Sequence, residues 1–385
     1  MKKVFRDPIY GYIHIIDPII HQLIDSKAFQ RLRRISQLSG VKMVFHGAEH
    51  SRFNHSLGVY ALACKVLEIN ESIQDHLSEY ERILFLTSAL LHDVGHGAYS
   101  HSFERVFHIN HEQMTASILL GDKEISAILD AHNENLKTDI SSVILKTHKF
   151  PIIESLISSQ LDIDRLDYLL RDAYYTGISY GKTDMDRIIR MLTIKDGKIV
   201  YKEGALHAIE NYLISRYHMY FQVYYHPAAR NHEVILEKIY TRINALFESL
   251  NDPYLNHLKQ AALGDLDSYL EIDDYYVNAL IKRFSHSADE ILSGLCNRFL
   301  NRKLFNFIEF SHEDEIKPIL AQQTSNYHFQ FEDVYQQAYK KEFDVVNQIF
   351  ILNKQGLILP IEEVSSIVKG LIDSGNKRIR RLYYE

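Results

Sequence analysis

A hydrophobic run that ends in two metal-capable side chains decides the fold: Ile83-Leu84-Phe85-Leu86-Thr87-Ser88-Ala89-Leu90-Leu91-His92-Asp93-Val94-Gly95-His96-Gly97. Residues 83–91 are apolar on nearly every side, which predicts a helix buried in a core. Core helices do not normally end in a His-Asp pair, and the two glycines that follow allow the backbone to turn tightly. We therefore interpret this stretch as the floor of a metal site.

More proton- and metal-binding side chains follow within twenty residues of His92. They are His96, His101, Glu104, His111 and Glu112. His101 and Glu104 are three residues apart, so on a helix the carboxylate can orient the imidazole. One such histidine could be a helix cap or a core residue, but the clustering favours a functional site.

A helix upstream of the run carries another histidine. His55 recurs with Val59, Leu62 and Val66 at steps of three and four residues, which places it on the buried stripe of that helix, and Arg52 lies one turn earlier. A lone histidine on such a stripe is more often a core residue than a ligand. The second His-rich helix makes a role for His55 as a metal ligand more plausible than a role as a core residue.

A downstream segment carries aspartates at helical spacing. Residues 161–172 predict a helix on which Asp164, Tyr168 and Asp172 share one face. An aspartate on a largely buried helix is costly unless it is paired or bound to a metal. Asp164 is therefore either a metal ligand or part of a salt-bridge ladder with Arg165, Asp167 and Arg171, and this segment alone leaves both open.

Composition limits the class of protein. The 385 residues carry 43 basic and 50 acidic side chains, a net charge of −7, which argues against a dedicated nucleic-acid binder. No apolar run is long enough to cross a membrane, and the N-terminus lacks the apolar stretch of a signal peptide. Cys64 and Cys296 imply no disulfide framework and fit a reducing cytoplasm, where we expect the protein.

The rest of the chain predicts helices with small strand pairs. Hairpins are expected at residues 4–15 and around the Asp196-Gly197 turn, helices at 19–37, 205–225 and 367–372, short helices and loops at 121–150, and strands at 345–361. Arg216, Tyr220 and Tyr224 share a face of the 205–225 helix. That face could clamp a phosphate and stack a ring, or it could be ordinary packing. The absence of a Gly-rich phosphate loop makes a P-loop ATPase or a dinucleotide-binding fold a poor fit.

Six motifs in order resemble the deoxynucleoside triphosphate triphosphohydrolases among the HD-domain phosphohydrolases. The motifs are Asp7-Pro8-Ile9-Tyr10-Gly11, Phe29-Gln30-Arg31-Leu32-Arg33, Gln37-Leu38, Arg52-Phe53-Asn54-His55-Ser56-Leu57-Gly58-Val59, His92-Asp93-Val94-Gly95-His96-Gly97 and Asp162-Ile163-Asp164-Arg165-Leu166-Asp167-Tyr168. The resemblance covers about residues 1–230. It implies a mainly α fold, an HD-domain helical bundle with small β-hairpins. Residues 1–250 would form the catalytic domain, and an α+β region at 251–385 would serve oligomerisation or regulation.

The resemblance also assigns a metal site and catalytic groups. His55, His92, Asp93 and Asp164 would hold one divalent ion per subunit, and such a mixed nitrogen and oxygen set suits Fe, Mn, Mg, Ni or Zn. In the family, water attacks the α-phosphorus of a dNTP, and the products are the deoxynucleoside and triphosphate. His101, oriented by Glu104, would be the acid–base residue. His96, His111 and Glu112 would contact phosphate or an additional Mg ion.

The substrate residues follow by the same resemblance, with dGTP as the expected nucleotide. Arg52, Arg165 and Arg216 would bind phosphate, Gln37 and Asp172 the sugar 3′-hydroxyl, and Tyr168 and Tyr224 the deoxyribose, with Leu38 beside them. Tyr224 would exclude a 2′-hydroxyl. The chain departs from the SAM-and-HD-domain branch of the family at Arg165, where that branch has lysine, and at Leu166, where it has an aromatic residue; arginine and lysine are not geometrically interchangeable.

The resemblance further implies regulation and assembly. Lys3, Asp25, Gln30 and Arg33 match a regulatory site for GTP or dGTP between subunits, and a homo-oligomer, dimer or tetramer, is expected. Two alternatives stay open at this stage. One is an HD phosphohydrolase acting on a monophosphate, a cyclic nucleotide or guanosine tetraphosphate. The other is a non-enzymatic nucleotide sensor that could bind nucleic acid through its basic terminal clusters.

Overall fold

Helix α5 (Glu79–Leu91) is the buried helix that the hydrophobic run predicts, and its residues from Leu84 to Leu91 are all buried. It begins with a capping box in which Ser78 and Glu81 satisfy each other's backbone groups. Helix α3 (Arg52–Ile69) packs against α5, and α11 (Ile163–Thr176) packs against α3. Three segments far apart in the sequence therefore meet at the end of α5.

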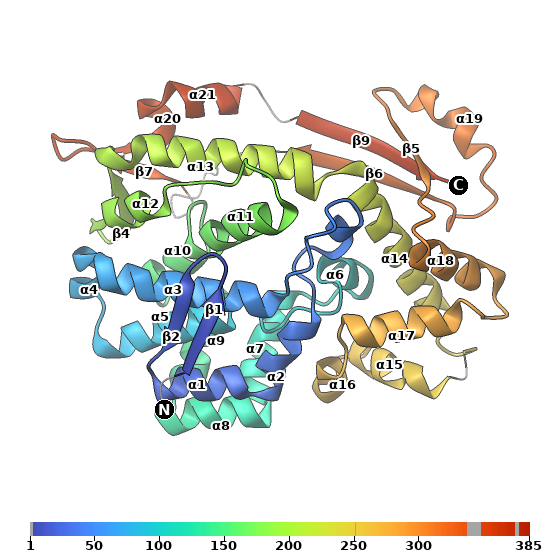
Figure 1. Ribbon diagram of the computed structural model, residues 1–385, viewed down its shortest axis with the longest axis horizontal. Coiled ribbons are helices and arrows are strands. Elements are labelled where there is room, and N and C mark those ends of the chain that lie inside the picture. The colour runs from blue at the N-terminus through green and yellow to red at the C-terminus, as the bar shows by residue number, and fades with distance from the viewer. Residues whose placement is uncertain (1–2, 251, 337–347, 374–376) are drawn as a thin grey trace.

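The structure is a computed structural model, and it describes residues 3–250, 252–336, 348–373 and 377–385. Within these ranges the fold is mainly helical, as predicted, and the strands form three small sheets (Figure 1). The other helices of the first 250 residues are α1 (Pro18–Asp25), α2 (Lys27–Arg31), α4 (Glu71–His76), α6 (His101–Phe107), α7 (His111–Gly121), α8 (Lys123–His132), α9 (Leu136–Ile144), α10 (Pro151–Ile157), α12 (Met185–Met191), α13 (Leu206–Met219) and α14 (Pro227–Ala245). Short helices at 121–150 are confirmed as α8 and α9.

Both predicted hairpins are present. Strands β1 (Lys3–Asp7) and β2 (Gly11–Ile15) pair antiparallel, and Asp7 accepts hydrogen bonds from the backbone of Ile9 and Tyr10 in the turn. Strands β3 (Leu192–Lys195) and β4 (Lys198–Lys202) form the second hairpin. Its turn residues, Asp196 and Gly197, have φ of 52° and 70°, as a type I′ turn requires.

The helix predicted at 205–225 is present, but its last turn is widened. Helix α13 ends at Met219, and residues Tyr220–Tyr224 form a π-helical turn closed by the hydrogen bond from Tyr225 N to Tyr220 O. Such turns insert one extra residue and are frequent at functional sites. The regular four-residue spacing expected for Arg216, Tyr220 and Tyr224 therefore does not continue to the end of the segment.

Residues after 250 combine helices with strands. The helices are α15 (Asn256–Ala262), α16 (Leu266–Leu270), α17 (Asp274–Phe284), α18 (Glu290–Leu300), α19 (Lys317–Leu320), α20 (Ile361–Val364) and α21 (Ser366–Asp373), the last being the helix predicted at 367–372. Strands β5 (Asn306–Glu309), β9 (Lys377–Tyr384) and β6 (Phe329–Gln336) form a sheet in that order. Of the strands predicted at 345–361, residues up to 347 lie outside the described residues. The rest contains β7 (Phe350–Leu352) and β8 (Ile358–Pro360), which extend the sheet of β3 and β4.

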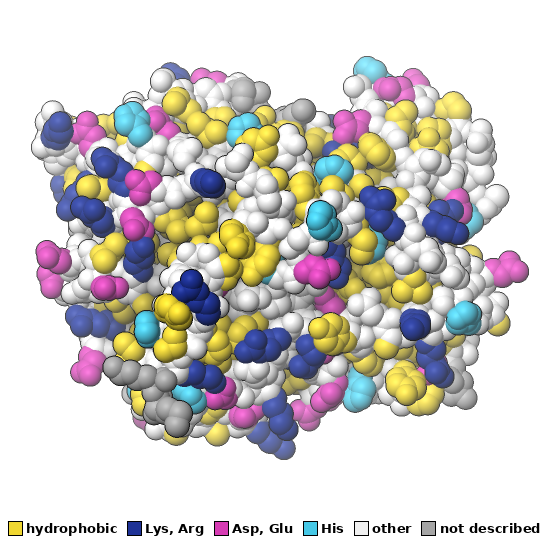
Figure 2. Space-filling model, viewed as in Figure 1, with side chains coloured by type: hydrophobic (Ala, Val, Ile, Leu, Met, Phe, Trp, Pro, Cys, Tyr) yellow, Lys and Arg dark blue, Asp and Glu magenta, His cyan; other side chains and the backbone are white. Residues whose placement is uncertain are grey.

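One hydrophobic core joins the two parts of the chain. Leu255 and Ile281, from beyond residue 250, belong to the same buried cluster as Phe29 and Leu90. Lys and Arg side chains are interspersed with Asp and Glu on the face shown in Figure 2. An anionic ligand would therefore be met by a local group of cations and not by a broad basic surface.

Candidate metal centre and catalytic cavity

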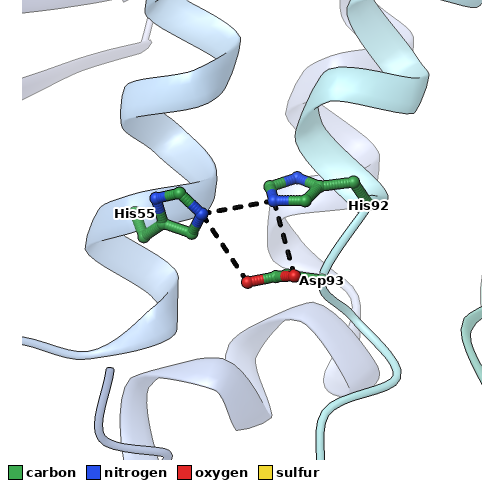
Figure 3. Close-up of side chains that lie close together, drawn as sticks. All are labelled: His55, His92 and Asp93. Atoms are coloured by element: carbon green, nitrogen blue, oxygen red, sulfur yellow. Dashed lines mark hydrogen bonds and ion pairs between the residues drawn. The ribbon is translucent and has the colours of Figure 1, made fainter. Parts of the chain in front are cut away.

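Four side chains from three segments converge at the end of α5. His55 comes from α3, His92 and Asp93 from the end of α5, and Asp164 from the first turn of α11. The Nε2 atoms of His55 and His92 are 3.2 Å apart, and Asp164 Oδ1 lies 3.0 Å from the first and 3.8 Å from the second. Figure 3 shows His55, His92 and Asp93 pointing toward one another. Two imidazole nitrogens and two carboxylates at these separations fit a single divalent cation.

Both histidines are held by their other ring nitrogen. Nδ1 of His55 is 2.8 Å from Asp167 Oδ2, and Nδ1 of His92 is 2.9 Å from the carbonyl oxygen of Ala89. These hydrogen bonds direct both Nε2 atoms to the centre, the arrangement in which metal-binding histidines are normally supported. Asp167 is fixed in turn by Arg171, at 2.9 Å. The salt-bridge ladder thus includes Asp167 and Arg171 but not Asp164, which faces the histidines.

The charges of this centre depend on one another. Burial by itself lowers the pKa of His55, but the hydrogen bonds to Asp164 and Asp167 raise it to about 10. Burial raises the pKa of Asp93, while His92 and Arg52 hold it well below its ordinary value. Burial also raises the pKa of Asp164, but its hydrogen bond with His55 and the charges of His55 and His92 lower it overall. The carboxylates of Asp93 and Asp164 are therefore charged at neutral pH, as metal ligands must be.

Four of the predicted catalytic side chains form a second cluster beside the first. Glu104 Oε2 lies 3.4 Å from His101 Nδ1 and 3.1 Å from His111 Nδ1. The rings of His96 and His111 are stacked with centroids 4.1 Å apart, and His96 Nε2 is 3.3 Å from Asp93 Oδ1. The hydrogen bond with His101, with a further contribution from His111, lowers the pKa of Glu104 to about 2. An ionised Glu104 is thus placed to orient the exposed His101 ring.

The two clusters line one cavity of about 620 Å³, a size that suits a nucleotide. Seven of the eight predicted substrate residues line it: Gln37, Leu38, Arg52, Arg165, Tyr168, Asp172 and Tyr224. Arg52 pairs with Asp93 and donates to Ser100 Oγ at 2.8 Å, so it lies directly against the metal centre.

Four of the predicted metal, catalytic and substrate residues do not line the cavity: His92, Glu104, Arg216 and Glu112. His92 and Glu104 contact residues that line it. Arg216 is buried behind Tyr220, with its guanidinium 5.7 Å from that ring, and it donates to Gln160 at 3.0 Å. Glu112 is half-buried, pairs with Lys146 at 3.2 Å and does not line the cavity. The structure therefore brings Arg216 close to the cavity and does not bring Glu112 to it.

The four residues matched to a regulatory site share one region near β1. Lys3 pairs with Asp25, and Arg33 donates to Gln30 Oε1 at 2.8 Å. Arg33 also lies over the Phe53 ring, 3.5 Å from its centroid. Burial lowers the pKa of the Arg33 guanidinium, and the charge of Asp25 opposes that shift. Their grouping is compatible with one site, and the regulatory role stays a prediction.

The sequence did not single out several side chains that build the cavity. His50 is buried, its Nε2 lies 2.8 Å from Asp172 Oδ1, and Tyr224 donates to the other oxygen of Asp172 at 2.6 Å. Of the residues that line the cavity itself, Tyr225, Arg230, Glu233 and Glu332 were not expected, whereas Tyr220 was expected on one helix face with Arg216 and Tyr224. His50 lies in a loop without periodicity, and Glu332 lies in a strand far along the chain, so neither spacing nor helix faces could point to them.

Comparison with known proteins identifies the class. The HD domain family matches residues 52–172, and the HD associated region matches residues 183–380. The chain is 45% identical to the uncharacterized protein YwfO of Bacillus subtilis, over 82% of this chain and 74% of that protein. With these matches and the four converging ligands, the chain belongs to the HD-domain phosphohydrolases.

Two further proteins are similar to this chain. A deoxynucleoside triphosphate triphosphohydrolase SAMHD1 homolog of Dictyostelium discoideum is 28% identical over 80% of this chain and 60% of that protein. A phosphohydrolase of Bacteroides thetaiotaomicron, solved by crystallography, has 27% identity and a TM-score of 0.86, with the whole of both chains covered. HD domains bind divalent metals, and His55, His92 and Asp93 form the candidate site here. No helix among the described residues is long and apolar enough to span a bilayer.

Proposed function

We propose that the protein hydrolyses deoxynucleoside triphosphates to the deoxynucleoside and triphosphate. The observation that carries the proposal is the cavity itself, which brings together the candidate metal centre, cationic arginines and histidines, and the hydrogen-bonded pair of Asp172 and Tyr224. Similarity to the SAMHD1 homolog supports the same substrate class.

The cationic side chains suit a polyphosphate. Arg52 and Arg165 line the cavity, and Arg216 adjoins it behind Tyr220. Gln37 Oε1, Ser39 Oγ and His96 Nδ1 line the cavity and are buried without a hydrogen-bond partner among the described residues, as is Arg216 Nε beside it. Buried polar atoms normally have hydrogen-bond partners, so four unpaired atoms on or beside one cavity favour a polar ligand that supplies those partners.

The reaction needs an electrophile, a water nucleophile and a proton for the leaving oxygen. A divalent ion, when bound by His55, His92, Asp93 and Asp164, supplies a Lewis acid at the α-phosphoryl group. The water oxygen forms the new bond to the α-phosphorus while the bond to the nucleoside O5′ breaks. His101, which Glu104 orients at 3.4 Å, is placed to transfer the proton that O5′ needs.

The sugar end of the cavity favours a 2′-deoxyribose. Asp172 is held from both sides, by His50 and by the Tyr224 hydroxyl, so its carboxylate is fixed for a sugar hydroxyl. The rings of Tyr168 and Tyr224 meet edge to face at 6.2 Å and form an apolar wall. Such a wall leaves a 2′-hydroxyl without a partner, which disfavours a ribonucleotide.

Product identification tests the proposal. Purified full-length protein with Mn²⁺ or Mg²⁺ is expected to convert dGTP to deoxyguanosine and triphosphate, and His92→Ala is expected to abolish turnover. Release of pyrophosphate or orthophosphate as the first product would reject it. Hydrolysis of a monophosphate, a cyclic nucleotide or guanosine tetraphosphate, with dNTPs left intact, would establish the alternative HD phosphohydrolase.

A further inference from the structure

The cavity extends beyond the residues matched to phosphate and sugar. Its remaining walls include Val41, Tyr225, Arg230, Glu233 and Glu332. Val41 comes from the segment that continues Gln37 and Leu38, and Tyr225 directly follows the π turn. Arg230 and Glu233 come from the start of α14, and Glu332 comes from β6. If the sugar lies against Gln37, Asp172 and Tyr224, the neighbouring end of the cavity is the space left for the base.

Glu233 is an acceptor built into that end. Its side chain is 15% exposed, and it pairs with Arg230 and, at 3.5 Å, with Arg105. Both contacts use Oε2. Among the described residues Oε1 has no hydrogen bond or ion pair, so Oε1 is the oxygen that can accept a hydrogen bond from a ligand. A carboxylate oxygen in a partly buried cavity favours a hydrogen-bond donor.

The surrounding side chains hold Glu233 in place. Gly40 leaves room for it, because a Cβ at that position would lie 3.0 Å from Glu233 Cγ and 2.4 Å from the carbonyl oxygen of Ala229. Arg230 is anchored on the far side by Glu332, which also accepts from the Tyr383 hydroxyl at 2.9 Å. Both carboxylate oxygens of Glu332 therefore have partners within the protein. Glu233 is the carboxylate whose Oε1 can accept a hydrogen bond from a ligand.

On the basis of the proposed function, we infer that Glu233 reads the nucleobase and favours guanine over thymine. Guanine presents two adjacent donors, N1–H and the N2 amino group, to a carboxylate. Thymine presents a single N3–H flanked by two carbonyl oxygens, which a carboxylate repels. A site that hydrogen-bonds a donor rejects an analogue that lacks it, since the buried acceptor then stays unpaired.

Two matched substitutions test the role of Glu233. Glu233→Gln keeps the shape and removes the charge next to the base. Glu237→Gln removes a carboxylate that pairs with the same Arg105, from the next turn of α14, but does not line the cavity. The value of kcat/KM is measured for dGTP and dTTP with Mn²⁺, at one fixed GTP concentration so that a regulatory site is equally occupied in each assay. Equilibrium binding of dGTP and dTTP is measured on the same proteins without turnover.

The inference is tested by the preference for dGTP over dTTP, which is the ratio of the two kcat/KM values and the ratio of the two binding affinities. We expect Glu233→Gln to lower this ratio about tenfold or more, in kcat/KM and in binding, and Glu237→Gln to keep the ratio of the unsubstituted protein. An unchanged ratio in Glu233→Gln, or an equal fall in Glu237→Gln, would overturn it. Failure to release triphosphate from any dNTP would contradict the proposed function instead, and the binding ratio would still judge Glu233.

Discussion

His55 offers one ring nitrogen to the metal centre and is held by the other, and the residue that holds it is buried Asp167. Asp167 also accepts from the Tyr10 hydroxyl at 2.8 Å and pairs with Arg171, which bonds Asp7 at 2.8 Å. The N-terminal hairpin therefore supports a metal ligand through two further side chains. Gly58 makes this possible, because a Cβ there would lie 2.0 Å from Asp167 Oδ1.

Asp167→Asn tests this support. The amide retains the volume but weakens the charge-assisted bond to His55, so the affinity for Mn²⁺ is expected to fall about 10- to 100-fold. Isothermal titration calorimetry measures the affinity, and thermal unfolding checks the fold. Asp186→Asn is the control, since Asp186 is exposed and pairs only at the surface with Lys65. Equal affinities in the two variants would contradict the support of His55 by Asp167.

The pH dependence of the rate gives a second test at this scale. Because the pKa of Glu104 is lowered to about 2, its carboxylate stays ionised at any pH above about 4, and protonation of Glu104 cannot cause an acidic limb near neutrality. Glu104→Gln is expected to lower kcat at every pH and to retain an acidic limb. A limb that disappears in this variant would show that Glu104 itself titrates there.

At the scale of elements, the turn between α5 and α6 is held by helices from the C-terminal part of the chain. Asp274, at the start of α17, accepts from the backbone N–H of Tyr99 at 2.7 Å and of Ser36 at 2.9 Å. Tyr99 and Ser100 have φ of 55° and 49°, a left-handed conformation that costs energy for such residues. The surrounding contacts therefore maintain a strained turn that presents Ser100 to Arg52.

Asp274→Asn tests this anchoring. The amide replaces one acceptor oxygen with a donor and leaves a buried N–H unpaired, which is expected to cost about 1–3 kcal/mol in the free energy of unfolding. Activity is expected to fall with it, although Asp274 does not touch the cavity. Urea unfolding and kcat are compared with those of Asp267→Asn, a substitution on the exposed side of α16. A stable and fully active Asp274→Asn would refute the anchoring role.

Sequence periodicity predicts the regular elements well and the connections poorly. The α5 run, both hairpins and the α11 face follow from local patterns that the structure confirms. The π turn at Tyr220–Tyr224 does not follow from a local pattern. Tyr224, at its end, donates to Asp172, a contact across 52 positions that sequence spacing does not encode. The same holds for His50, which meets Asp172 across 122 positions from a loop.

At the scale of the whole molecule, residues on both sides of position 250 share one core. Tyr269 donates to the carbonyl oxygen of Gly95 at 2.6 Å, and Arg31 donates to the carbonyl oxygens of both Ile272 and His96. The family resemblance pointed to the four candidate metal ligands, which the structure brings together, but a resemblance limited to residues 1–230 could not show that β6 and α14 contribute to the cavity. Those contributions depend on tertiary packing alone.

A truncated chain tests whether residues 1–250 depend on the core that they share with the rest of the chain. A protein of residues 1–250 would expose the surface that Leu255, Tyr269 and Ile281 cover, and it is expected to lack cooperative unfolding and activity. Near-UV circular dichroism during thermal unfolding measures cooperativity. A truncated protein with a cooperative transition and measurable turnover would establish 1–250 as an independent domain.

The central claim is that water attacks the α-phosphorus of a deoxynucleoside triphosphate beside the four-ligand centre. Turnover of dGTP in ¹⁸O-labelled water tests it most directly, with the position of the label read by ³¹P NMR and mass spectrometry. The account predicts that the label enters the α-phosphoryl group of intact triphosphate and that the deoxyguanosine is unlabelled. Label in orthophosphate or pyrophosphate as the primary product, or in the 5′-hydroxyl of the nucleoside, would contradict it.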